Sequence, residues 1–244
     1  MVEEAGSTNA IVIERAQAGG PEGLVVVAEH QTAGRGRLDR SWLAPPRSAL
    51  TFSVLLRPTV PAAAWPWLPL LAGHAVSTAL VTAGFDTSVK WPNDVLLGDR
   101  KVAGILVERL ETPTGPAAVV GIGLNVGMTA DELPVPEATS LALAGDAPDR
   151  TELLGLLLDT LWDTYVAWQA GGEDAANRLA ASYAAGCATL GRDVSVALPA
   201  GATLAGRAVE IDPSGRLVVS TSIGGRTAVG AGDVVHVRDA TRDK

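Results

Sequence analysis

The chain has 244 residues, 47% of them hydrophobic, which is enough for one large domain or for a main domain with a small second one. Its formal net charge of −8 argues against a general electrostatic grip on nucleic acid, and no apolar run reaches membrane-spanning length without polar interruption. A single cysteine, Cys187, and no leader-like start favour a reducing compartment, so we expect a cytoplasmic protein that binds neither DNA nor membranes.

The first part of the chain alternates between short strands and helices. Short apolar runs predict strands, whereas residues 65–83 lack strand alternation and predict a helix closed by Gly84. Gly98 and Asp99 predict a tight hairpin turn, and residues 134–148 form a long connection with no clear pattern. The other expected elements are a helix at 10–18 and strands at 24–28, 51–56, 88–91, 95–97, 102–110 and 117–126.

The pattern becomes helical at Asp149 and then all-β. Asp149 and Glu152 have capping-box-like spacing ahead of an apolar helical stripe, and an alanine-rich helix is predicted at 174–185. Short alternating segments then predict strands at 194–198, 204–211, 217–220 and 234–237. We therefore predict two domains, 1–186 and 187–244, of which the second is a small β module.

A segment rich in glycine and arginine lies between the first two predicted strands, and we name residues 34–42 the arginine loop. It consists of Gly34, Arg35, Gly36, Arg37, Leu38, Asp39, Arg40, Ser41 and Trp42. The glycines allow backbone N–H groups to face an anion, the guanidinium groups suit carboxylate or phosphate, and the indole suits stacking on a purine. The alternative is a solvated surface loop, because neither a Walker motif nor a dinucleotide fingerprint is present.

A second polar segment follows the strand predicted at 88–91. Pro92 ends this strand, so Asn93 and Asp94 stand at its exit, where α/β sheets often present functional groups. The alternative is a turn capped by its own side chains, with Lys90 in solvent.

Lys101 is one of only three lysines and lies at the mouth of the predicted hairpin. Three residues later, Gly104 stands where a strand favours a β-branched residue, and Gly121 and Gly123 interrupt another strand in the same way. These glycines predict close approach of a ligand or a neighbouring group, although Lys101 could also be a hairpin lysine that faces water.

A third polar cluster, Ser7, Thr8 and Asn9, precedes the helix predicted at 10–18. It is compatible with a simple N-cap, which contributes about 1 kcal/mol. It could equally offer hydroxyls and an amide to a small polar ligand, with Gln31 as a further contributor.

Taken together, these segments resemble the bacterial biotin protein ligases in order and spacing over nearly the whole chain. The matching blocks are 6–9, 29–37, 90–94, 101–108 and 121–126. Five blocks in the same order are far more specific than any one of them.

The resemblance implies a fold and an activity. The expected fold is of the α/β (α+β) class, with a mixed-sheet catalytic domain of the class II synthetase and biotin ligase kind followed by an SH3-like β-barrel. The implied reaction uses biotin, ATP and Mg²⁺ to form biotinyl-5′-AMP. The biotinyl group then passes to a lysine of the biotin carboxyl carrier protein of an acyl-CoA carboxylase.

The resemblance also implies roles for individual residues. The expected biotin-binding residues are Ser7, Thr8, Asn9, Gln31, Gly34, Arg35, Gly36, Arg37 and Lys101. The expected adenylate-binding residues are Arg35, Arg37, Arg40, Trp42, Asn93, Lys101 and Asn125. Because the first step brings two anions together, the expected catalytic residues are Lys101, Arg35 and Arg37, with Asp94 as a base or orienting group for the acceptor lysine. The metal ligands stay open.

The chain departs from the family in two respects. Many members continue the arginine loop as Arg-Gly, whereas Leu38 and Asp39 stand here, so we expect a carboxylate beside the phosphate site and weaker retention of the adenylate. No winged-helix domain precedes the first block, which predicts a ligase without repressor function, either a monomer or a homodimer. The approach to the first block is short, which leaves open a native start upstream of Met1.

Two other functions remain as alternatives. A lipoate or octanoate ligase or transferase would share the same fold. An arginine-glycine nucleic-acid binder attached to an SH3-like barrel is opposed by the acidic net charge and by an aromatic content of 4%.

Overall fold

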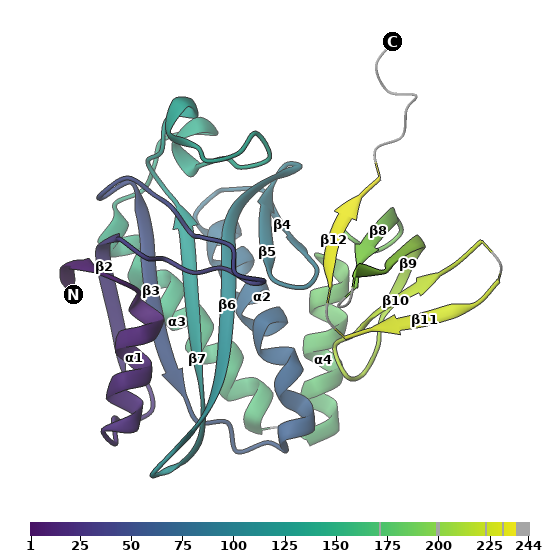
Figure 1. Ribbon diagram of the computed structural model, residues 1–244, viewed down its shortest axis with the longest axis horizontal. Coiled ribbons are helices and arrows are strands. Elements are labelled where there is room, and N and C mark those ends of the chain that lie inside the picture. The colour runs from purple at the N-terminus through teal and green to yellow at the C-terminus, as the bar shows by residue number, and fades with distance from the viewer. Residues whose placement is uncertain (171, 199–200, 223, 231, 238–244) are drawn as a thin grey trace.

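The computed structural model describes residues 1–170, 172–198, 201–222, 224–230 and 232–237, which form two sheets and a layer of helices (Figure 1). The larger sheet has seven strands in the order β1-β2-β3-β7-β6-β5-β4. Only β1 and β2 pair in parallel, so the sheet is mixed, as predicted. Its strands are β1 (Val2–Ala5), β2 (Val25–Gln31), β3 (Ala49–Leu56), β4 (Thr87–Lys90), β5 (Asp94–Leu97), β6 (Arg100–Thr112) and β7 (Gly115–Asn125).

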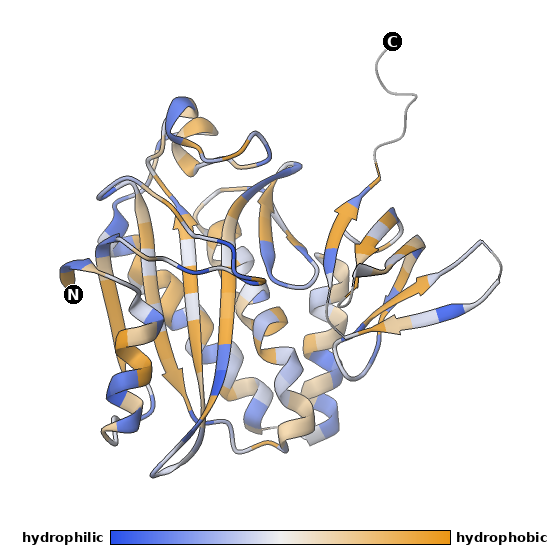
Figure 2. Ribbon diagram, in the orientation of Figure 1, coloured by the Kyte–Doolittle hydropathy of each residue, from blue (hydrophilic) through white to orange (hydrophobic). Residues whose placement is uncertain are grey.

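Helices cover both faces of this sheet. α1 (Thr8–Gln17) lies on one face, where Val12 and Ala16 pack against Leu55 and Val119. The opposite face carries α2 (Leu68–Thr82), α3 (Arg150–Ala170) and α4 (Gly172–Ala185) (Figure 1). Because both faces are covered, β3 is buried along its whole length, which explains its nearly continuous apolar sequence (Figure 2).

The helix predicted at 65–83 is divided in the structure. A 3₁₀ helix, η1 (Ala62–Trp67), contains Pro66, and α2 begins only at Leu68 with Pro69 in its first turn. Proline lacks an N–H group and fits the first turn of a helix, where that group needs no helical partner. The prediction was therefore wrong at its start but right in placing the end before Gly84.

Some elements had no counterpart among the predictions. β1 is a four-residue edge strand with three exposed residues, and β11 (Arg226–Val229) is similarly exposed. The connection at 134–148 contains a short 3₁₀ helix, η3 (Leu141–Leu143), and another, η2 (Ala130–Glu132), precedes it. These elements are too short or too polar to give a clear period.

The C-terminal part forms a five-stranded antiparallel sheet in the order β11-β10-β9-β8-β12, as expected for an SH3-like module. Its remaining strands are β8 (Asp193–Ala197), β9 (Thr203–Ile211), β10 (Leu217–Ser220) and β12 (Asp233–His236). Val194 and Leu217 of this sheet belong to the same hydrophobic cluster as the large sheet. The division into domains at residue 186 stays a prediction.

Two tryptophans attach the smaller sheet to the rest of the protein. Trp91 Nε1 donates a hydrogen bond to the carbonyl of Gly215 at 3.0 Å, and Trp67 Nε1 donates to that of Pro213 at 2.9 Å. The Trp91 side chain is fully buried. Since Trp91 also begins the turn that carries Asn93, the smaller sheet is held beside one of the predicted functional segments.

Within the described ranges, no helix has the length and apolar character needed to cross a bilayer.

Candidate active site

One cavity of about 130 Å³ lies between the arginine loop, the start of α1 and the adjacent strands β6 and β7. A single water needs only about 10–15 Å³ of such space, so the cavity can admit a larger molecule. All the predicted site residues line it except Gly34 and Asn125. Those that do are Ser7, Thr8, Asn9, Gln31, Arg35, Gly36, Arg37, Arg40, Trp42, Asn93, Asp94 and Lys101.

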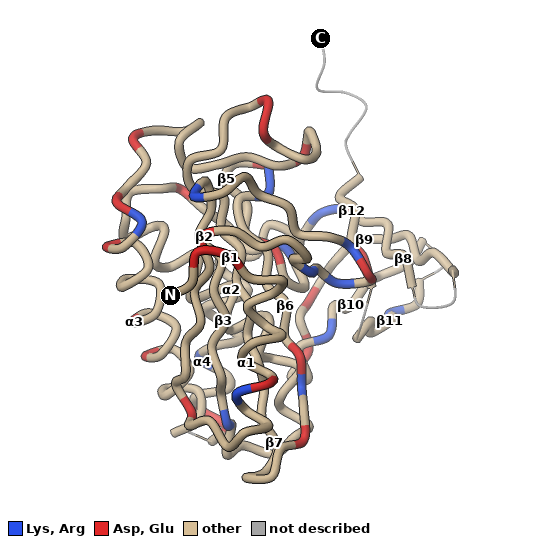
Figure 3. The backbone as a smooth tube through the Cα atoms, turned by 60° about the vertical axis from the view of Figure 1, so that its left-hand side comes forward, with Lys and Arg blue, Asp and Glu red and all other residues tan. Residues whose placement is uncertain are grey.

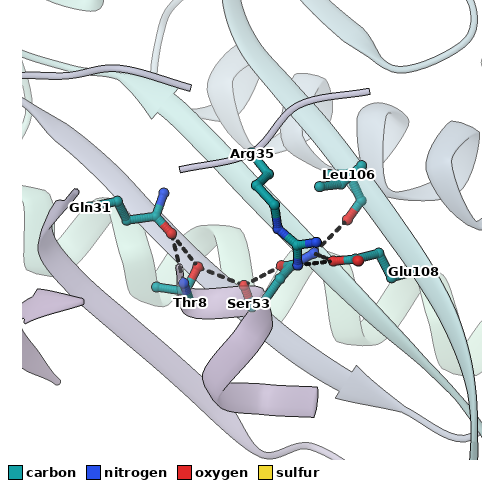
Figure 4. Close-up of polar contacts among 7 residues, drawn as sticks. Thr8, Gln31, Arg35, Ser53, Leu106 and Glu108 are labelled. Carbon is teal, nitrogen blue, oxygen red and sulfur yellow. Dashed lines mark hydrogen bonds and ion pairs between the residues drawn. The ribbon is translucent and has the colours of Figure 1, made fainter. Parts of the chain in front are cut away.

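A chain of hydrogen bonds forms one end of the cavity (Figure 4). Gln31 Oε1 accepts from the backbone N–H of Thr8 at 2.7 Å and lies 3.0 Å from its hydroxyl oxygen. Ser53 Oγ contacts Thr8 Oγ1 at 2.7 Å and Asn9 Oδ1 at 2.5 Å. Asn9 Nδ2 donates to Glu108 Oε2 at 2.7 Å, and Arg35 donates to the same oxygen at 2.9 Å. The start of α1 is thus connected to the arginine loop.

Ser7 occupies the N-cap position of α1 but makes no capping hydrogen bond. Gln31, from a neighbouring strand, accepts the N–H of Thr8 instead. The simple N-cap alternative therefore does not account for the Ser7 side chain, which lines the cavity.

The arginine loop is a narrow hairpin closed at both ends by backbone hydrogen bonds. Trp42 N donates to Gly34 O at 2.9 Å, and Arg40 N donates to Arg37 O at 3.2 Å. The two residues at the tip, Leu38 and Asp39, have positive φ angles of 55° and 57°, in the left-handed region that favours glycine and asparagine. Asp39 is exposed and does not line the cavity, whereas Leu38 does, so the structure does not place the Asp39 carboxylate in the cavity wall. Its expected effect on adenylate retention stays a prediction.

Glycines of β6 and β7 form the floor beneath this loop. A side chain at Gly123 would overlap the Trp42 indole, and one at Gly121 would overlap the amide of Asn9. A Cβ atom at Gly104 would stand 3.0 Å from Lys101 Nζ. The close approach predicted at these glycines is therefore made by side chains of the protein, which the missing Cβ atoms allow to lie flat on the sheet.

Lys101 is fixed by its backbone and by its ammonium group. Its N–H donates to Glu137 O at 2.7 Å and its carbonyl accepts from Thr139 N at 2.8 Å, so the unpatterned connection at 134–148 runs directly beside it. Lys101 Nζ lies 2.5 Å from Asp94 Oδ1. This ion pair compensates that oxygen, which has no hydrogen-bond partner among the described residues.

The other two loop arginines reach the smaller sheet. Arg40 forms a bidentate ion pair with Asp233 of β12, and its hydrogen bonds to this carboxylate raise the pKa of Arg40. Arg37 donates to Asn93 Oδ1 at 2.9 Å and to the carbonyl of Gly232 at 3.2 Å. Burial lowers the pKa of Arg37, while Asp233 and Asp94 act in the opposite direction. The smaller sheet is thus part of the cavity wall.

Asn125 lies outside the cavity. It is buried, and its Nδ2 donates to Thr139 O at 2.9 Å, which holds the connection that flanks Lys101. Gly34 also does not line the cavity, because it is buried between Gln31 and the backbone of Trp42.

Sequence reasoning missed three residues whose side chains hydrogen-bond to those of the predicted ones: Ser53, Glu108 and Asp233. Ser53 is fully buried within an otherwise apolar strand, and this polar interruption was a usable signal. Glu108 stands among mixed polar and apolar residues, next to Arg109, and Asp233 follows the glycine-rich segment 230–232 of the sequence, so neither stands out locally.

The electrostatics of the site differ from those of the whole surface. Along the described part of the chain, basic and acidic positions are interspersed, which opposes a nucleic-acid-binding face (Figure 3). Three cations of the cavity are instead each held by one carboxylate: Arg35 by Glu108, Arg40 by Asp233 and Lys101 by Asp94. An anionic ligand can take the place of the carboxylates on Arg35 and Lys101, and the buried Trp42 Nε1, which has no partner in the described structure, can donate to it.

Residues 5–125 match the biotin/lipoate A/B protein ligase family. The biotin–[acetyl-CoA-carboxylase] ligase of Mycobacterium tuberculosis is 44% identical over 98% of this chain and 88% of that protein. The bifunctional ligase/repressor BirA of Bacillus subtilis is 36% identical over 89% of this chain and 68% of that protein. A solved biotin protein ligase from Aquifex aeolicus, in complex with biotin and ATP, is 29% identical with a TM-score of 0.79 over 97% of each chain. These similarities confirm the predicted family: the chain belongs to the biotin/lipoate A/B protein ligases and, within them, to the biotin–[acetyl-CoA-carboxylase] ligases.

Proposed function

We propose that this protein joins biotin to ATP, forming biotinyl-5′-AMP and pyrophosphate, and then transfers the biotinyl group to a lysine of a biotin carboxyl carrier protein. The observation that carries the proposal is the chemical difference between the two ends of the cavity. At one end, Asn9 lies over Gly121, and Thr8 and Gln31, which belong to the same hydrogen-bond chain, offer an acceptor and an amide. Two residues further along β7, Trp42 lies over Gly123, and Lys101 lies over Gly104, which pairs with Gly123. Biotin has a cyclic urea at one end and a carboxylate at the other, which matches this order.

The first step is an attack of the biotin carboxylate on the α-phosphorus of ATP, with pyrophosphate as the leaving group. Both reactants are anions, so cations must hold them together and stabilise the charge that develops. Lys101, Arg35 and Arg37 serve this purpose in our proposal. They exchange their contacts with Asp94, Glu108 and Asn93 for contacts with the ligand.

The second step is attack of the acceptor lysine amine on the carbonyl carbon of the mixed anhydride. The bond between this carbon and the phosphate oxygen breaks, AMP leaves, and the amine loses a proton. Asp94 is the carboxylate placed to orient the amine or take this proton, because it becomes free when Lys101 moves to the phosphate. The arginine loop, closed over the cavity, excludes water from the reactive anhydride.

Magnesium enters this reaction as part of the nucleotide substrate. The described residues contain no group of three His, Cys, Asp or Glu side chains that could hold a metal ion. Mg²⁺ commonly binds through one or two carboxylates together with substrate phosphates, and Asp94 in the cavity wall suits that arrangement. The carrier protein of an acyl-CoA carboxylase as acceptor, and the cytoplasm as the site of action, are parts of the same proposal.

A lipoate ligase is the alternative within the family. The dithiolane ring of lipoate has neither N–H nor C=O, so it would offer no partner to the Gln31 amide nitrogen or to the remaining lone pair of the Thr8 hydroxyl. Sites built to hydrogen-bond a substrate strongly reject analogues that lack those groups. The polar end of the cavity therefore favours biotin.

The test measures pyrophosphate release by the purified protein with ATP, magnesium and biotin, lipoate or neither. We expect release only with biotin, and streptavidin-detectable labelling when a biotin carboxyl carrier domain is added. Release with lipoate alone would assign the other substrate, and no release with either would overturn the proposal.

A further inference from the structure

The hydrogen-bond chain that joins Gln31, Thr8, Ser53 and Asn9 contains fewer hydroxyl protons than oxygen-to-oxygen contacts. Three oxygen-to-oxygen contacts connect Gln31 to Thr8, Thr8 to Ser53 and Ser53 to Asn9. Amide oxygens only accept, so the hydroxyls of Thr8 and Ser53 supply the only two protons for these three contacts. One contact therefore lacks a proton, and the chain has an excess of oxygen lone pairs.

Glu108 causes this shortage. A carboxylate only accepts, so it draws Asn9 Nδ2 toward itself at 2.7 Å, and the carbonyl of Leu106 accepts from the same nitrogen at 3.4 Å. Asn9 Oδ1 then faces Ser53 at 2.5 Å, closer than the 2.7 Å between Ser53 and Thr8, so we assign the single Ser53 proton to Asn9. At the other end, the Thr8 backbone N–H fixes Gln31 Oε1 as an acceptor. The Thr8 oxygen receives no proton from either neighbour.

We propose that Glu108 is a positioning residue that makes the Thr8 hydroxyl an acceptor for a ligand N–H group, through Asn9 and Ser53. This inference rests on the proposed function, because the N–H group is that of a cyclic urea. The Thr8 hydroxyl can donate its own proton either to Gln31 or to Ser53. Both acceptors belong to the hydrogen-bond chain, so in either case the lone pairs of Thr8 are left for a ligand in the cavity. The amide nitrogen of Gln31 stays free to donate to the urea carbonyl.

Glu108→Gln tests this relay. A glutamine can donate as well as accept, so Asn9 can turn over and place Nδ2 against Ser53, which supplies the missing proton. The Thr8 oxygen then accepts from Ser53 and becomes a poorer partner for the ligand. We expect biotin binding, measured by calorimetry without ATP, to weaken about tenfold, the equivalent of one hydrogen bond. In steady-state kinetics the loss should appear as a higher KM for biotin.

Glu111→Gln is the matched control. Glu111 lies on the same strand, pairs with Arg109 at 2.9 Å and does not line the cavity. We expect wild-type biotin binding from this variant. Equal binding by Glu108→Gln and Glu111→Gln would overturn the inference.

A double-mutant cycle with Ser53→Ala separates the relay from the Arg35 ion pair, which Glu108→Gln also weakens. Ser53 contacts Thr8 and Asn9 but not Arg35, so its removal interrupts only the relay. If the relay operates, Glu108→Gln has no further effect on biotin binding in the Ser53→Ala background. Additive effects would assign the role of Glu108 to Arg35 instead. Wild-type pyrophosphate release with biotin, measured beside the variants, shows whether the proposed function itself holds.

Discussion

Individual cationic side chains in this cavity are paired with carboxylates, which carry the same charge as the proposed ligands. Lys101 is the clearest case, because its ammonium group rests on Asp94 while its backbone is pinned on both sides by residues 137–139. The side chain can therefore exchange one anion for another without any change of the strand. Gly104 leaves the space across which it lies. Such a compact, mobile cation differs in use from the planar guanidinium groups of the arginine loop.

We predict that Lys101→Ala lowers the rate of pyrophosphate release by about a hundredfold or more, the usual effect of removing one charged or hydrogen-bonding group that acts on the transition state. The fold should persist, because the hydrogen bonds to Glu137 and Thr139 come from the backbone. Steady-state kinetics and thermal unfolding check both parts. Lys90→Ala, which removes a lysine that does not line the cavity, is the control. Wild-type turnover by Lys101→Ala would exclude Lys101 from the chemistry.

Among the secondary-structure elements, the sequence predicted the long ones with a regular apolar pattern. It missed short ones that depend on pairing with a neighbouring strand. Strand β3 and helix α3 follow clear apolar patterns and were predicted from them. Strand β1 was missed because only one of its four residues is buried, and it depends on pairing with β2. The same reason applies to the site, where contacts across strands, such as Glu108 with Asn9, have no local signature.

The arginine loop is an element whose position depends on the smaller sheet. Its tip carries two left-handed residues, which cost about 1–3 kcal/mol each and persist where surrounding contacts offset this cost. Beside this tip, Arg40 pairs with Asp233, and Arg37 binds Gly232 and Asn93. The loop is therefore fixed from the opposite side of the cavity, by a part of the chain almost two hundred residues away.

We predict that Asp233→Asn loosens the arginine loop. Trypsin should cleave the loop about two to five times faster, and KM for ATP should rise by a similar factor, since exposed ion pairs contribute about 0.2–1 kcal/mol. The difference should shrink at high salt because both partners are partly exposed. Glu210→Gln, which removes a carboxylate 3.6 Å from Arg226 in the same sheet, is the control. A lower KM for ATP in Asp233→Asn would show that Asp233 competes with phosphate instead.

For the whole molecule, the junction between the two sheets combines buried aromatic and polar contacts. The buried Thr189 hydroxyl accepts from Trp91 N at 3.0 Å and lies 3.1 Å from His236 Nε2. Because His236 stands on β12, next to the residues that contact the arginine loop, the stability of the junction affects the cavity wall as well.

We predict that this junction makes the protein less stable in mild acid. Burial, followed by the charges of Lys90 and Arg192, lowers the pKa of His236 from 6.5 to about 4, although Asp99 acts in the opposite direction. Between these pH values the unfolded chain binds this proton and the folded protein does not, so the free energy of unfolding falls as pH falls from about 6.5 to 4. His236→Gln keeps a hydrogen-bonding group for Thr189 but cannot titrate, so its denaturant-derived stability should decline less steeply over this range. The difference in slope between the two stability curves should stay below the value for one full proton, because His236 is only partly buried. Parallel stability curves for the two proteins between pH 6.5 and 4 would show that His236 does not couple the junction to pH.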